Sequence, residues 1–263
     1  MPILDAVARA HFDRHGWAHL PAFFDAVRRH DLVEWTNEIG AWPETPGKWM
    51  RYYERLVGDP ATKMLARVEN FVPYHAGLAE SLTGARVRAL LTELLGEPVT
   101  LFKDKINFKL PGGAGCDDHQ DAPAYVDFGV EHHLTFAVPV DRMTPENGCL
   151  EMAMDASARV FLPQKADGSL QPAVMAGMDV RPLTVELGDA LVFDAWVPHR
   201  SGPNRSTGPR RAYYLTFNPA SAGDHRAAYF ARKRRCFPPE YERQPGVDYA
   251  ARGRQFNLAN PFD

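Results

Sequence analysis

The chain has 263 residues, 45% of them hydrophobic, and a formal net charge of −3. This length and apolar content suit one sizeable core, and the small net charge gives no bias toward nucleic acid or another polyanion. Three cysteines, an odd number at irregular spacing, argue against a disulfide framework and indicate a reducing compartment, the cytoplasm.

Membrane attachment and secretion are not expected either. No apolar run approaches the roughly 18 residues that a membrane-spanning helix needs. Charged residues such as Arg9 and Asp13 interrupt the N-terminal stretch, so it lacks the apolar centre of a signal peptide. We therefore expect a soluble intracellular protein without a membrane partner.

Residues 1–98 are expected to form a mostly helical flank. Helical periodicity recurs in three stretches, residues 4–15, 26–39 and 78–95. Gly96 follows the last of these directly and is a typical C-terminal cap. A short strand is predicted over 17–23, and the segment 42–58, rich in aromatic residues, proline and charge, is predicted to be irregular surface structure.

From residue 99 onward the pattern changes to strands and turns. Strands are predicted at 99–110, 117–121, 131–140, 149–153, 158–162, 180–187, 190–197 and 211–218. Asn147-Gly148 predicts a hairpin turn between two of them. Helices followed by eight short strands indicate a mainly β fold with flanking helices, a double-stranded β-helix of the jelly-roll or cupin type.

The whole chain, 1–263, is expected to be one domain. We find no repeat, no low-complexity tract and no linker that would separate two units. Within it the jelly-roll core is expected over 99–220, and a helix followed by a tail over 221–263. A basic run in that helix, Arg232-Lys233-Arg234-Arg235, is interpreted as a solvated helix face.

His119-Gln120-Asp121 is the most informative motif. Residues i and i+2 of an extended strand point to the same face, so this imidazole and this carboxylate project together. His199, at the end of another predicted strand, would supply a second imidazole. Two histidines and one carboxylate form the facial triad of non-haem Fe(II) oxygenases. Taken alone, such a motif is more often a pair of buried, hydrogen-bonded side chains.

The surroundings of the motif favour the metal site. The glycine-rich turn Gly112-Gly113-Ala114-Gly115 leads into His119, and a second turn follows His199. Arg210 begins a later strand, and its planar guanidinium can hold the far carboxylate of 2-oxoglutarate through two hydrogen bonds. An arginine at such a position would otherwise be read as a surface ion pair.

In these segments the chain resembles the phytanoyl-CoA dioxygenase family of Fe(II)/2-oxoglutarate oxygenases. The matching segments are Lys105–Lys109, His119–Asp121, Pro145–Leu150, Pro198–Asn204 and the strand beginning at Arg210. The resemblance implies Fe(II) as cofactor, with 2-oxoglutarate and O2 as co-substrates. It implies three iron ligands, which are also the catalytic residues: His119, Asp121 and His199. It implies three contacts to 2-oxoglutarate: Arg210, Asn107 and Ser201.

The strand before the metal motif suggests the substrate. Lys103, Lys105 and Asn107 share one face of it, and the fold of the family directs that face into the barrel, where cations would select a small anion. A solvated lysine face on a half-buried strand is the alternative. The segments around His119 look most like the bacterial branch that includes 2-aminoethylphosphonate dioxygenases. We therefore expect a hydroxylase of an aminoalkylphosphonate, with Lys105 and Lys103 as substrate-binding residues.

Three alternatives stay open. The same chemistry is compatible with another small metabolite, an ectoine-like zwitterion or an acyl-CoA. A jelly roll that binds metal and 2-oxoglutarate without catalysis would be a sensor, and steady formation of succinate would exclude it. A zinc hydrolase with the same three ligands would work without O2, and it gives Arg210 no role.

Overall fold

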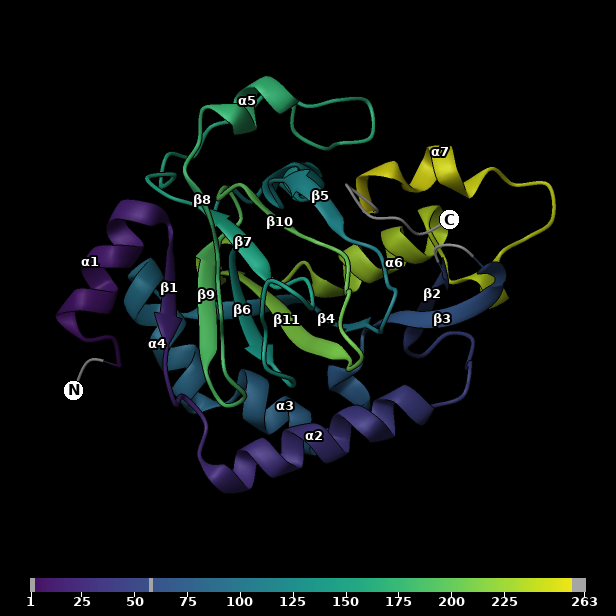
Figure 1. The fold of residues 1–263 in the computed structure, drawn as a ribbon, viewed down its shortest axis with the longest axis horizontal. Coiled ribbons are helices and arrows are strands. Elements are labelled where there is room, and N and C mark those ends of the chain that lie inside the picture. The colour runs from purple at the N-terminus through teal and green to yellow at the C-terminus, as the bar shows by residue number, and fades with distance from the viewer. Residues whose placement is uncertain (1–2, 57–58, 257–263) are drawn as a thin grey trace.

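Two β-sheets form the core of the computed structural model, which describes residues 3–56 and 59–256 (Figure 1). The larger sheet consists of β1 (Trp17–Leu20), β2 (Met50–Leu56), β3 (Asp59–Glu69), β4 (Val99–Lys109), β6 (Leu134–Pro139), β9 (Ala190–Asp194) and β11 (Arg210–Pro219). The smaller sheet consists of β5 (Cys116–His119), β7 (Leu150–Ala153), β8 (Val180–Pro182) and β10 (His199–Ser201).

The strand order gives the two-sheet jelly-roll core predicted from the sequence. In the larger sheet it is β1-β9-β6-β11-β4-β3-β2, and in the smaller sheet it is β5-β10-β7-β8. Every pair of neighbouring strands is antiparallel. Neighbours in each sheet are mostly distant in sequence, so strands from far apart in the chain meet at the centre.

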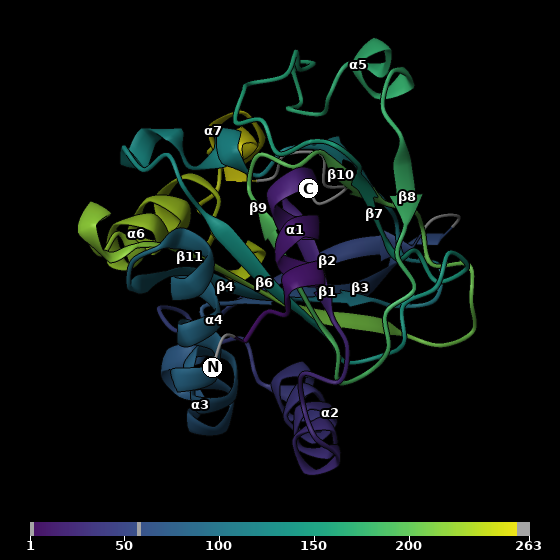
Figure 2. The same cartoon turned by 90° about the vertical axis from the view of Figure 1, so that its left-hand side faces the viewer.

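Helices cover the outside of this core. The α-helices are α1 (Ala6–His15), α2 (Ala26–Ala41), α3 (Ala76–Thr83), α4 (Ala85–Leu95), α5 (Pro172–Ala176), α6 (Arg226–Cys236) and α7 (Tyr249–Gly253). The 3-10 turns are η1 (Val72–Tyr74), η2 (Ala122–Ala124), η3 (Val126–Phe128), η4 (Ala220–Ala222), η5 (Glu240–Glu242) and η6 (Arg254–Phe256). In Figures 1 and 2, α2 and α3 lie on one side of the molecule and α5 on the opposite side. None of the described helices combines the length and the apolar content that crossing a membrane requires.

The two faces of the larger sheet pack against different layers. On its outer face, Leu32 of α2 and Leu90 of α4 share a core cluster with Ile106 of β4. On its inner face, Leu191 and Tyr214 pack with residues of the smaller sheet. Burial of a leucine or isoleucine contributes about 1.5–3 kcal/mol each, and this apolar burial holds the sheets without any contribution from a metal.

The helix ends follow the sequence signals. Gly96 adopts a left-handed φ of 80° and its N–H reaches the Thr92 carbonyl, which ends α4 as predicted. Asp25 begins α2 by accepting a hydrogen bond from the Arg28 N–H. The predicted helix over 78–95 is in fact two helices, because Gly84 begins a second one.

Several predicted elements were wrong. Residues 50–56, expected to be irregular surface structure, form the edge strand β2, and no strand covers 158–162. The strands β3 and β10 were not predicted at all. Asn147-Gly148 does not close a hairpin, because β6 and β7 on either side of it belong to different sheets. Residues 1–98, expected to be mostly helical, supply β1, β2 and β3 to the larger sheet.

A bulge in β4 changes the face of one aromatic residue. The register of β11 against β4 shifts between Thr216 and Phe217, opposite Lys103 and Leu101. Phe102 therefore packs with the aromatic cluster on the inner side and does not join Ile106 on the outer face. Bulges re-aim side chains next to functional sites, and this one leaves Lys103 directed inward with Phe102 beside it.

Candidate active site

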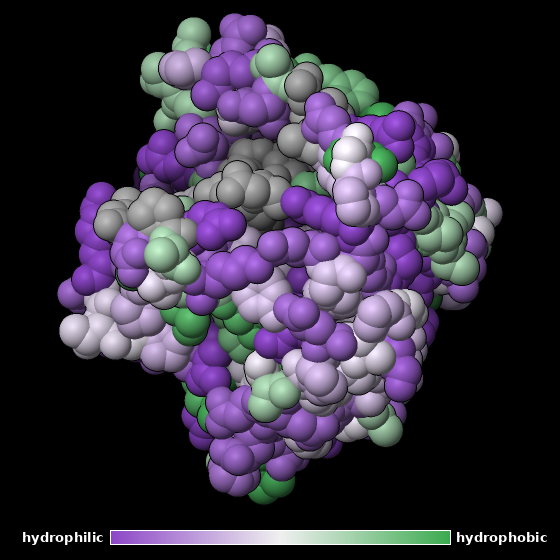
Figure 3. Space-filling view, turned by 90° about the vertical axis from the view of Figure 1, so that its right-hand side faces the viewer, coloured by the Kyte–Doolittle hydropathy of each residue, from purple (hydrophilic) through white to green (hydrophobic). Residues whose placement is uncertain are grey.

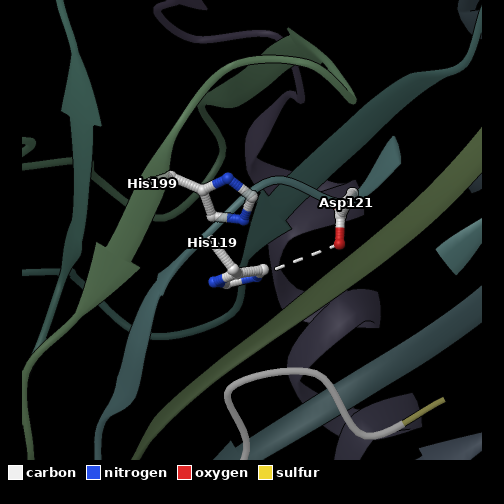
Figure 4. A group of neighbouring side chains, drawn as sticks. All are labelled: His119, Asp121 and His199. Atoms are coloured by element: carbon white, nitrogen blue, oxygen red, sulfur yellow. Dashed lines mark ion pairs between the residues drawn. The ribbon is translucent and has the colours of Figure 1, made fainter. Parts of the chain in front are cut away.

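The smaller sheet brings the three predicted metal ligands together. His119 ends β5 and pairs in register with His199, the first residue of β10. Asp121 follows two residues later, at the start of η2. One ligand atom of each residue lies within 4.8 Å of the other two, and the three side chains point toward a common centre (Figure 4).

Backbone contacts set the tautomer of both imidazoles. Nδ1 of His119 lies 2.7 Å from the Asp117 carbonyl oxygen, and Nδ1 of His199 lies 3.0 Å from the Val197 carbonyl oxygen. A carbonyl oxygen only accepts, so Nδ1 carries the proton and Nε2 keeps its lone pair. Such contacts orient histidines that bind metals.

The charges at this cluster also fit a divalent cation. Burial lowers the pKa of His119 and lowers the pKa of His199 to about 4, so both rings are neutral. Burial alone would raise the pKa of Asp121, but Lys103 and Lys105 hold it well below its usual range. Two neutral nitrogen donors and one carboxylate are the donor set that Fe(II) takes in a facial triad.

Arg210 lies in the same cavity as this cluster and is 1% exposed. It is the first residue of β11. One of its terminal nitrogens donates to the Gly148 carbonyl at 2.7 Å, and the other donates to the Tyr214 hydroxyl at 3.3 Å. Its Nε has no hydrogen-bond partner within the described part of the chain. A buried guanidinium that is only partly satisfied fits a planar carboxylate ligand.

Lys109 also lines the cavity, although it was not among the predicted substrate-binding residues. It pairs with Arg210 across the sheet, and its Nζ lies 2.8 Å from the Ser201 hydroxyl and 2.5 Å from the Gly202 carbonyl. Burial and the neighbouring Arg210 lower its pKa to about 6. The signal was present, since Lys109 continues the alternation of Lys103, Lys105 and Asn107. The predicted co-substrate residue Ser201 is thus in contact with the amine of Lys109.

Lys103, Lys105 and Asn107 also line the cavity, as their shared parity predicted. The Nζ of Lys103 lies 4.5 Å from the ring centre of Tyr125, and the Nζ of Lys105 lies 5.3 Å from that of Tyr214. Burial and the charge of Lys105 lower the pKa of Lys103 to about 7. These two cations therefore repel each other in a site that is largely shielded from water.

A buried charge network that reaches the cavity through Arg67 was not predicted. Arg67 of β3 donates from Nε to the Asn107 side-chain oxygen at 3.0 Å, and also contacts Glu69. Lys233 of α6 donates to both carboxylate oxygens of Glu69, at 2.6 and 2.7 Å. Burial would raise the pKa of Glu69, but Lys233 and Arg67 lower it to about 2. β3 was not predicted, and Lys233 belongs to the run interpreted as solvated.

We expect Lys233→Met to lower the free energy of unfolding by on the order of 3 kcal/mol, because it removes the main partner of the buried Glu69 carboxylate. Denaturant unfolding at neutral pH measures the effect. Arg235→Met is the matched control, since Arg235 is exposed in the same helix. Equal losses in the two variants would show that the Lys233–Glu69 pair does not stabilise the fold, and adding Glu69→Met to Lys233→Met should restore part of the loss.

Other histidines have structural positions. His75 accepts a hydrogen bond from the Leu78 N–H at 3.1 Å and so caps α3. His133 is buried, with its ring 4.8 Å from Phe102 and 4.7 Å from Tyr125. Neither side chain lines the cavity that holds the predicted metal ligands.

The phytanoyl-CoA dioxygenase (PhyH) family model matches residues 12–212. The chain is 44% identical to a 2-aminoethylphosphonate dioxygenase from an uncultured bacterium, over 94% of each chain. It is 39% identical to a methylphosphonate hydroxylase from Gimesia maris, over 86% of this chain and 85% of the other.

Solved structures with the same fold include two that hold a metal or a co-substrate. The structure of EctD from S. alaskensis with bound Fe has a TM-score of 0.71 at 21% identity, covering 84% of this chain and 79% of EctD. The structure of EvdO2 from Micromonospora carbonacea var. aurantiaca complexed with 2-oxoglutarate has a TM-score of 0.66 at 26% identity, covering 82% of this chain and 91% of EvdO2.

Proposed function

We propose that this chain, which belongs to the phytanoyl-CoA dioxygenase family, hydroxylates a C–H bond of a small phosphonate, with an aminoalkylphosphonate such as 2-aminoethylphosphonate as substrate. It is an Fe(II)/2-oxoglutarate-dependent dioxygenase. The observation that carries the substrate proposal is a pair of lysines, the buried Lys103 and the half-buried Lys105, in the cavity of a histidine–aspartate–histidine cluster. The similarity to two phosphonate oxygenases over most of the chain supports it.

Three residues of the cavity suit Fe(II), the cofactor of this reaction. His119, Asp121 and His199 would hold Fe(II), which together with 2-oxoglutarate and O2 supplies the oxidising power for C–H cleavage and yields succinate and CO2. Asp121 stays ionised and both imidazoles stay neutral, so the three residues offer lone pairs at neutral pH. His119 and His199 are buried and Asp121 is half-buried, so their side chains would limit the access of bulk water to the reaction.

The basic side chains of the cavity would bind two different anions, 2-oxoglutarate at one place and the phosphonate at another. Arg210 would bind the far carboxylate of 2-oxoglutarate through its guanidinium, with the Lys109 amine and the Ser201 hydroxyl as further hydrogen-bond donors. Asn107 is oriented toward the same cavity by the contact between Arg67 and its side-chain oxygen. Lys103 and Lys105 would hold the phosphonate, whose charge offsets the repulsion between them.

The proposed partner is a small anionic molecule, and the proposed compartment is the cytoplasm. In the described part of the chain no disulfide joins the three cysteines, Cys116, Cys149 and Cys236, as fits a reducing compartment. Neither nucleic acid nor a membrane has a part in the proposed reaction.

We expect Lys105→Met to raise the KM for 2-aminoethylphosphonate by roughly 10-fold or more, about 1.4 kcal/mol, because a lysine binds a phosphonate oxygen cluster as a point charge. Uncoupled decarboxylation of 2-oxoglutarate should change much less, since Arg210 and Lys109 lie nearer to that anion's far carboxylate. Succinate release, measured with and without phosphonate on the Fe(II)-loaded enzyme, gives both quantities.

Lys165→Met is the matched control, because Lys165 is exposed and lies outside the cavity. The substrate class is tested on the unaltered enzyme with 2-aminoethylphosphonate, its N-methylated analogues, an ectoine-like zwitterion and short acyl-CoA thioesters. Stimulation of succinate release by phosphonates alone supports the proposal. Stimulation only by CoA thioesters or zwitterions would contradict it, and steady succinate release excludes the sensor alternative.

A further inference from the structure

We infer that Phe256, near the C-terminus, forms a wall of the substrate cavity and limits the length of the phosphonate that the enzyme accepts. The inference rests on the proposed function. Besides residues of the two sheets, the loop between β4 and β5, and Asp121, the cavity is lined by Ala124 of η2, Tyr229 of α6, and Gln255 and Phe256 of η6. We refer to these four residues as the cavity wall.

Phe256 is packed inward. The face that carries α6 and α7 is mostly hydrophilic (Figure 3), yet Phe256 is only 6% exposed. Its ring meets that of Tyr229 edge-on, with the ring centres 5.6 Å apart. Lys233, which is bound to Glu69, places its Nζ 5.9 Å from the Phe256 ring centre. Phe256 therefore belongs to the interior next to the charge network.

Close contacts fix the backbone before Phe256, so the Phe256 ring cannot easily move away from the cavity. At Gly253, the last residue of α7, an added Cβ would lie 2.2 Å from a ring carbon of Phe237, so the backbone directly before η6 packs closely on Phe237. Arg232 of α6 donates to the side-chain oxygen of Gln255 at 3.2 Å and also pairs with Asp127 of η3. One arginine thus joins η6 to the segment that follows the predicted metal ligand Asp121.

The chemistry of the wall indicates selection by size. Among the described residues that line the cavity, only Asp121 and Glu54 are carboxylates. Asp121 is a predicted metal ligand, and Glu54 accepts a hydrogen bond from the Ala114 N–H, toward the Lys109 end. An alkyl chain extending from a phosphonate at Lys103 therefore meets two aromatic rings, Tyr229 and Phe256, and no carboxylate that would bind an amine.

The position of Lys103 connects the wall to the proposed anion site. Its Nζ lies 5.8 Å from the ring centre of Tyr229, and Tyr229 is in turn in contact with Phe256. A phosphonate held by Lys103 would thus lie beside Tyr229, with the Phe256 ring as the next side chain of this wall. Short chains fit this space, and longer ones collide with the ring or lose their position at the metal.

The test compares Phe256→Ala and Phe256→Leu with the unaltered enzyme, each loaded with Fe(II). Substrates are methyl-, 2-aminoethyl-, 3-aminopropyl- and 4-aminobutylphosphonate. We expect the ratio of kcat/KM for 4-aminobutyl- over 2-aminoethylphosphonate to rise by roughly 10-fold or more in Phe256→Ala, since a difference of one or two methylenes is worth about 10- to 200-fold in a fitted pocket. Phe256→Leu should give a smaller rise, and the KM for 2-oxoglutarate should stay the same.

The matched control is Phe161→Ala, because Phe161 is 58% exposed and lies outside the cavity. A parallel fall for all four phosphonates in both Phe256 variants, with the ratio unchanged, would overturn the inference while leaving the proposed function intact. If no phosphonate stimulates succinate release by the unaltered enzyme, the proposed function is wrong and the inference falls with it. Circular dichroism establishes that each variant is folded.

Discussion

Replacement of His119, Asp121 or His199 by alanine is expected to abolish turnover and to remove most of the affinity for Fe(II). Each substitution deletes one of three bonds to the metal, and the remaining two ligands cannot define a facial triad. Asp121→Ala has a further cost, because this carboxylate faces the charges of Lys103 and Lys105. Without it, Lys103 and Lys105 would stand beside the incoming divalent metal with no carboxylate to offset their charge.

The measurement is the visible charge-transfer band of the Fe(II)–2-oxoglutarate complex under anaerobic conditions, followed by succinate release after O2 is admitted. The fold should survive, since the apolar core between the sheets and helices does not depend on these three side chains. His30→Ala is the control, because His30 is exposed on α2. A normal band and normal turnover in Asp121→Ala would show that this carboxylate is not a ligand.

Arg210→Lys is expected to raise the Kd for 2-oxoglutarate by about 30-fold or more, which is about 2 kcal/mol, while Fe(II) still binds. Lysine keeps the positive charge but cannot present two donors in one plane. The substitution also removes the contacts that Arg210 makes to the Gly148 carbonyl and the Tyr214 hydroxyl. Anaerobic titration of the Fe(II)-loaded enzyme with 2-oxoglutarate measures the change.

Arg211→Lys is the matched control for Arg210→Lys. Arg211 faces away from the cavity, where it makes a two-point ion pair with Asp141 and a hydrogen bond to Asn37. Its loss should lower stability modestly and leave the Kd for 2-oxoglutarate unchanged. Equal increases of this Kd in the two variants would mean that the guanidinium of Arg210 does not bind the co-substrate.

Local periodicity made the centre of the site predictable. The i, i+2 relation of His119 and Asp121 and the shared parity of Lys103, Lys105 and Asn107 depend only on extended backbone. These side chains do lie in one cavity. The jelly-roll fold followed from many short strands after a helical flank, and the family resemblance supplied the partner strand with His199.

The remaining features depend on tertiary contacts that no local pattern encodes. β2 and β3 contain many long polar side chains, so they do not show the apolar alternation of a typical strand. Some of these side chains are buried by pairing with distant residues, as Glu69 is with Lys233. The bulge beside Lys103 is defined by the pairing of β4 with β11, a strand more than 100 residues later in the chain. In the sequence, Lys233 cannot be distinguished from an exposed lysine of a basic helix, because its partner Glu69 lies on the distant strand β3.

The link between Lys233 and Glu69 also has a consequence for the order in which the protein matures. The predicted metal ligands and Arg210 are all synthesised before Tyr229, Lys233 and Phe256. Chains leave the ribosome N-terminus first, so the residues of the proposed iron site are made before the residues of α6 and η6 that line the same cavity. The pairing of Lys233 with Glu69 joins α6 to β3 across 164 positions of the chain, so the cavity takes its final form only after α6 has been made.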